Sequence, residues 1–143
     1  MSVDYKDLLK KSRSSLPKVQ LPPPGRGIFK LGQGKIYEPT KDDGNARVSI
    51  PARWQTVHPD SGLEAGAYNR NDFETVFVSI FLSGAGAYER VNEILDAAGM
   101  PADMATEEAL KAIEGREVSA IVTHGERRDT GEPEARLNKF ASL

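Results

Sequence analysis

The sequence predicts a mainly β domain with short helices, and three observations favour that fold class. Residues 73–82, FETVFVSIFL, alternate strictly between two faces, as a half-buried strand does. Four further segments have strand patterns and are separated by glycine, proline and polar residues. The chain has 143 residues, which is the length of about one domain. We therefore expect a single sheet-based domain.

An N-terminal segment precedes this domain. An amphipathic helix is predicted from about Asp4 to Arg13, with its apolar residues on one side. The stretch from Leu16 to Gly27 contains three consecutive prolines, so it cannot be helical and is expected to be an extended lead-in. These patterns divide the chain into a helix with a proline-rich lead-in, residues 1–26, and one domain, residues 27–143.

The first two strands come directly after the lead-in. One is expected from about Ile28 to Tyr37, bent or bulged at Gly32 and Gly34. The next is expected from about Arg47 to Val57, where Pro51 indicates an edge or a bulge.

The remaining elements follow in order. The connection 58–72 is longer than an ordinary hairpin loop and indicates a functional or mobile segment. After the third strand, 73–82, an amphipathic helix is predicted, and Thr106 is expected to cap a second, short helix. The last two strands are expected over Glu117–His124 and Glu134–Phe140.

The order strand, strand, strand, helix, strand, strand is that of the OB-fold, a five-stranded Greek-key barrel with a helix between strands 3 and 4. In this fold the loops between strands one and two and between strands four and five often flank an oligonucleotide groove. The sequence therefore predicts an OB-fold with an N-terminal helical extension.

The chain also resembles a family of small phage-encoded proteins that includes single-stranded DNA-binding proteins. The similarity covers nearly the whole chain, through the segments VDYKDLLKK, LPPPGRG, ERVNEILDAAGM, EGREVSAIVTH and EARLNKFASL in this order and spacing. It implies an OB-fold viral protein of phage DNA replication or recombination, acting in the cytoplasm of the host bacterium with phage or host replication and recombination proteins as partners. The chain departs from many single-strand binders at its end, KFASL, where they have an acidic tail.

Charge is unevenly distributed along the sequence. The net charge is −2, but residues 1–53 contain 11 Lys and Arg against 5 Asp and Glu, and residues 54–143 contain 8 against 16. Because salt screens exposed charges beyond roughly 8 Å, a local basic surface attracts phosphates even on an acidic protein. The alternative is that acidic helices simply cluster late in the chain. No apolar run has the length of a membrane span, so we expect a soluble intracellular protein.

The candidate DNA-binding residues are aromatic and basic side chains on the predicted strands and turns. Rings at alternate strand positions provide flat surfaces on which unpaired bases stack, and Lys and Arg neutralise phosphates. The candidates are Lys30, Lys35, Tyr37, Arg47, Arg53, Trp54, Phe73, Phe77, Phe81, Arg127 and Arg128. The alternative for the three phenylalanines is a second core under the long loop or the N-terminal helix, and for Trp54 it is a place in the main core.

No catalytic constellation is found in the sequence. The chain has no cysteine, and hence no disulfide, thiolate ligand or thiol nucleophile. Residues 84–86, GAG, follow a strand and open a helix, but Glu89 stands where a dinucleotide fingerprint has its third glycine. His58 and His124 lack a second ligand at metal-binding spacing. We expect no enzyme activity, cofactor or metal.

The function favoured by these observations is sequence-tolerant binding and protection of single-stranded DNA. The alternative is a protein-interaction adaptor, in which the same barrel has its groove filled by its own loop and its acidic second half contacts a partner.

Overall fold

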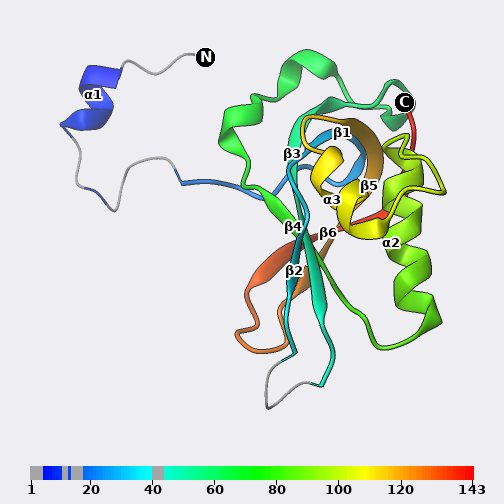
Figure 1. Cartoon of the computed structure of the whole chain (residues 1–143). Helices are drawn as coiled ribbons and strands as arrows, with labels where there is room; N and C mark the ends of the chain where they lie inside the picture. The colour runs from blue at the N-terminus through cyan, green and yellow to red at the C-terminus, as the bar shows by residue number, and fades with distance from the viewer. Residues whose placement is uncertain (1–4, 11–12, 14–17, 40–43) are drawn as a thin grey trace.

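The computed structural model describes residues 5–10, 13, 18–39 and 44–143 (Figure 1). In this part of the chain six antiparallel strands form one sheet that is not closed: β1 (Gly25–Leu31), β2 (Lys35–Tyr37), β3 (Arg47–Val57), β4 (Val76–Phe81), β5 (Glu117–Glu126) and β6 (Pro133–Ala141). The strand order is β2-β3-β1-β5-β6, and β4 pairs with β3 on the side opposite β1 and β2. The mainly β fold class predicted from the sequence is confirmed.

The first predicted strand is divided into β1 and β2, because residues 32–34, which include Gly32 and Gly34, leave the strand conformation. The N–H of Gly32 donates to the carbonyl of Pro51 at 2.9 Å, and the N–H of Gly34 donates to the carbonyl of Leu110 at 2.8 Å. A Cβ on Gly32 would lie 2.7 Å from Pro51 Cγ, and a Cβ on Gly34 would lie 2.8 Å from Leu110 Cδ2. The predicted irregularity at the two glycines is therefore present, but the described sheet has six strands instead of the predicted five.

Pro51 lies in the interior of β3, not at the edge or bulge that the sequence favours. The N–H and C=O of one residue in an antiparallel strand point to the same neighbouring strand. Because the Pro51 carbonyl accepts from Gly32, its missing N–H faces the break between β1 and β2, where no ladder pairing is lost. Alternation continues beyond the proline, with Ala52 and Trp54 buried and Arg53 exposed.

The proline-rich lead-in is attached to the sheet. Gln20 forms a parallel bridge with Phe73. Pro22 is fully buried, and its carbonyl accepts a hydrogen bond from His124 Nε2 at 2.7 Å. β1 begins at Gly25, before the predicted boundary between residues 26 and 27.

One helix, α1 (Tyr5–Leu9), is described in the N-terminal segment, within the predicted range Asp4–Arg13. It lies apart from the sheet in Figure 1. Parts of the predicted helix, lead-in and loop after the first strand lie outside the described residues, namely 1–4, 11–12, 14–17 and 40–43.

Two helices between β4 and β5 pack against the core, α2 (Ala85–Ala97) and α3 (Thr106–Ala112). Val91 and Ile94 of α2 are buried together with the inward-facing residues of β1, β3, β4 and β5. Thr106, the predicted cap, is instead the first residue of α3, and the N-cap is Ala105, which makes no side-chain capping bond.

The sheet curls so that its two ends approach each other. Residues 76–79 of β4 and 134–138 of β6 line one cleft, together with Arg90 of α2. The ends of the sheet therefore face one another without being paired.

Candidate functional site

The side chains of β4 alternate between buried and exposed positions, as the sequence pattern of this strand predicts. Val76, Val78 and Ile80 are at most 7% exposed, whereas Phe77 is 64% exposed and Phe81 is 49% exposed. Large apolar side chains in contact with water often mark an interaction surface. Phe77 and Phe81 are thus not part of a second core in this structure.

A row of three side chains crosses β2, β3 and β4. Tyr37 pairs in register with Arg47, and Arg47 pairs with Phe81. Direct partners on antiparallel strands have their side chains on the same face of the sheet. The guanidinium carbon of Arg47 lies 4.5 Å from the centre of the Tyr37 ring, a cation–π contact that contributes about 0.5–1 kcal/mol at an exposed site. The row therefore combines two accessible rings with a positive charge.

This row belongs to a larger surface, which we call the outer face. It comprises the side chains of β2, β3 and β4 that point away from the core, with one residue of β1: Lys30, Lys35, Tyr37, Arg47, Ser49, Pro51, Arg53, Phe77, Ser79 and Phe81. Arg47 and Arg53 lie six positions apart on β3, and hence about 20 Å apart along the strand. The structure brings most of the sequence-predicted candidates together on this face.

The charged residues of the outer face are all basic. Lys30, Lys35, Arg47 and Arg53 form no ion pair with another described residue. Their positive charge is therefore not neutralised within the described part of the chain, and the outer face attracts anions although the whole chain is acidic.

A cleft of about 330 Å³ continues this surface where β1 and β3 meet the 3-10 turn Arg70–Asp72. Its lining residues are Lys30, Arg53, Trp54, Gln55, Arg70, Asn71 and Phe73, and we call it the basic cleft. Arg70 Nη1 donates a hydrogen bond to Gln55 Oε1 at 3.2 Å.

Sequence reasoning missed three of these residues: Gln55, Arg70 and Asn71. The length of the connection 58–72 marked the region as notable, but no pattern in it indicates which residue reaches β3. The alternation of β3 does place Gln55 on the same side of the strand as Arg53, and that signal was available.

Trp54 and Phe73 pack in an aromatic cluster with Tyr68. The Trp54 ring makes edge contacts with Phe73 at 5.0 Å and with Tyr68 at 5.9 Å between centroids. Trp54 is 3% exposed, so the structure places it in the core and not on a stacking surface. Phe73 is half-buried in the same cluster, which fits its alternative assignment as a residue covered by the long connection.

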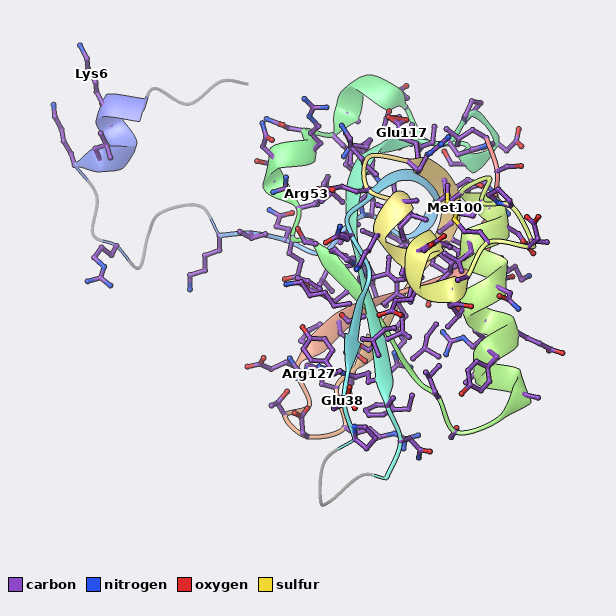
Figure 2. The ribbon with its side chains drawn as sticks, viewed as in Figure 1. Lys6, Glu38, Arg53, Met100, Glu117 and Arg127 are labelled. Atoms are coloured by element: carbon purple, nitrogen blue, oxygen red, sulfur yellow. The ribbon has the colours of Figure 1, made fainter. Side chains whose placement is uncertain are left out.

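The turn between β5 and β6 holds Arg127 and Arg128. Arg127 Nε lies 3.4 Å from Asp129 Oδ1, and both side chains are largely exposed. The charge of Arg127 is therefore partly compensated locally. Both arginines lie between β5 and β6, outside the strands of the outer face. Figure 2 labels Arg127 in this turn.

The remaining chemical groups have local structural roles. His58 Nδ1 accepts from the N–H of Asp60 at 3.1 Å, and His124 donates to Pro22. Gly84 is the N-cap of α2. Among the described residues, no group of three or more potential metal ligands comes together.

No protein-family model matches this sequence, and no match is found among curated proteins. Within the described ranges, no helix combines the length and apolar character needed to cross a membrane. The features of this chain that bear on function are therefore the outer face and the basic cleft.

Proposed function

We propose that the outer face binds single-stranded DNA with little sequence preference. The observation that carries this proposal is the combination, on one face of the sheet, of the exposed rings of Tyr37, Phe77 and Phe81 with basic side chains that have no described ion-pair partner. Stacking of a base on an aromatic ring contributes about 1–3 kcal/mol and tolerates any base. Lysine and arginine neutralise phosphates, which supplies affinity without sequence information.

The proposal extends to the fold, in which β1 and β2 together act as the first strand of an OB-fold barrel. Three features support it: the antiparallel pairing of β3 with β1, β2 and β4, the helix α2 between β4 and β5, and the approach of β4 to β6. In that arrangement the turn 127–132 between β5 and β6, with Arg127 and Arg128, is proposed to contact the same strand of DNA.

The resemblance to small phage-encoded proteins supplies the proposed setting, DNA replication or recombination in the cytoplasm of a host bacterium. The protein then acts by equilibrium binding, not by catalysis, and keeps the strand extended and protected. Phage or host replication and recombination proteins are its proposed further partners.

The second candidate function is a protein-interaction adaptor. It is favoured by one observation, the covering of Trp54 and Phe73 by Tyr68 of the long connection. The exposed rings of Phe77 and Phe81 favour DNA binding instead, because they lie on one face with basic side chains that have no ion-pair partner among the described residues, a combination suited to bases and phosphates.

Fluorescence anisotropy of a labelled oligothymidylate, at low and moderate salt, tests the two functions. We expect saturable binding that weakens with salt, and weaker binding to a duplex of the same length. An absence of saturable binding at low salt contradicts the DNA-binding proposal and favours the adaptor. Tighter binding to the duplex contradicts the stacking mechanism.

A further inference from the structure

The basic cleft differs from the rest of the outer face because three cations converge in it. Lys30 and Arg53 are direct partners across β1 and β3. Like charges at directly opposed positions of a sheet destabilise it. Arg70 adds a third charge from the long connection, and none of the residues that line the cleft is acidic.

The nearest acid by register is not ion-paired with Lys30. Glu117 of β5 is the partner of Lys30 on its other side. Glu117 forms no ion pair with a described residue, and it does not line the cleft. The arrangement therefore fits an occupant with a concentrated negative charge.

Hydrogen bonds hold the wall of the cleft in place. Gln55 accepts from Arg70 at 3.2 Å and donates from Nε2 to the Arg53 carbonyl at 3.1 Å. Asn69 Oδ1 accepts from the N–H of Asn71 at 3.0 Å, which fixes the turn that carries Arg70. A site that is organised before binding loses less entropy when it is occupied.

The backbone beyond this turn is fixed as well. The N–H of Gln20 donates to the Asp72 carbonyl at 2.8 Å, and the N–H of Glu74 donates to the Gln20 carbonyl at 2.9 Å. Phe73, between these two bonds, packs edge-on against Trp54. The cleft is therefore bounded by a segment whose backbone is hydrogen-bonded on both sides of Phe73. Figure 2 shows Arg53 beside the ribbon of the long connection.

Size and charge identify the class of ligand. A volume of about 330 Å³ is at the lower end of the range for small-ligand sites, so the cleft suits a single small group. A phosphate monoester carries about −1.5 to −2 charges near neutral pH, more than an internal phosphodiester, and has three acceptor oxygens for three cationic groups. The amides of Gln55 and Asn71 add neutral hydrogen-bonding groups beside it.

We infer that the basic cleft holds the terminal phosphate of a DNA strand that lies on the outer face. This inference rests on the proposed function. The cleft is at the Arg53 end of the face, about 20 Å along β3 from the row of Tyr37, Arg47 and Phe81. A strand anchored there by its end has its neighbouring nucleotides over Phe77 and then over that row.

The test compares three oligothymidylates of one length, with a 5′-phosphate, a 3′-phosphate or hydroxyl groups at both ends. We expect one of the phosphorylated strands to bind about tenfold more tightly than the hydroxyl strand, equivalent to 1.4 kcal/mol. Arg70→Gln should remove this preference. Arg47→Gln is the matched control, since it removes one charge at the far end of the face and should weaken all three strands by a similar factor.

Two results of this comparison would overturn the inference. If the three strands bind equally, the inference fails while the proposed function stands. A preference for a phosphorylated end that persists in Arg70→Gln also overturns it, because the terminal phosphate is then bound elsewhere.

If none of the strands binds, the proposed function fails, and titration with thymidine monophosphate tests the cleft by itself. Saturable binding that Arg70→Gln abolishes then supports a phosphate site, and the absence of such binding overturns it.

Discussion

The guanidinium carbon of Arg47 lies 4.5 Å from the centre of the Tyr37 ring, and the two residues are direct partners across β2 and β3. The contact holds the planar guanidinium against an exposed ring. Arg47 is also the register partner of Phe81, so a base stacked on the Phe81 ring would lie beside the positive charge of Arg47. Stacking and phosphate neutralisation thus have a common location in the proposed interface.

Replacing both Arg47 and Arg53 with glutamine should reduce the salt dependence of DNA binding. Single-strand binding releases about 0.7 counterion per neutralised phosphate, so the slope of log affinity against log salt should become shallower by about 1.4. Anisotropy titrations at several salt concentrations measure this slope. The control is the double variant Arg127→Gln and Arg128→Gln, which removes the same charge from the β5–β6 turn and should change the slope less. If the folded double variant of Arg47 and Arg53 has an unaltered salt slope, these two residues of β3 do not contact the phosphates.

Phe77→Ala should weaken DNA binding by about 1–3 kcal/mol, because the ring is 64% exposed and is proposed to stack on a base. Its thermal transition should change little. The matched control is the neighbouring core residue Ile80, which is 2% exposed and whose replacement by alanine should cost about 2–5 kcal/mol of stability. Loss of the thermal transition in Phe77→Ala, with normal binding by the remaining folded protein, would assign Phe77 to the core.

Trp54→Ala should lower the free energy of unfolding by about 3–5 kcal/mol, since the ring is 3% exposed and packs against Tyr68 and Phe73. Urea denaturation followed by circular dichroism measures this change. Trp54→Phe should retain more of the packing and lose less stability. If Trp54→Ala is as stable as the original protein and fails only in DNA binding, Trp54 is a stacking residue after all.

Gly32→Ala should destabilise the protein by about 1–3 kcal/mol, because the new Cβ would lie 2.7 Å from the ring of Pro51. Gly86→Ala is the matched control. It adds the same methyl group within α2, where nothing lies within 4 Å of the new Cβ, and should stabilise the helix by up to about 1 kcal/mol. Thermal unfolding of the two variants measures the contrast, and equal stability would show that the break between β1 and β2 tolerates a side chain.

The strands themselves were predictable from the sequence because their signal is local. The period of two in residues 76–81 and 47–57 determines which side chains are buried, and it requires only that one face of the strand meets the core. The outward-facing side chains of Phe77, Arg47 and Arg53 follow directly from that alternation. The mainly β fold class follows for the same reason.

The tertiary structure decided what depends on contacts between distant segments. Gly32 interrupts a strand because Pro51 of β3 lies against it, and Trp54 is buried because Tyr68 and Phe73 close over it. Arg70 reaches the basic cleft only because the long connection folds back onto β3. Alternation specifies the face of a strand on which a side chain lies, whereas register and loop path specify what it meets there, and these arise only when the whole sheet is assembled.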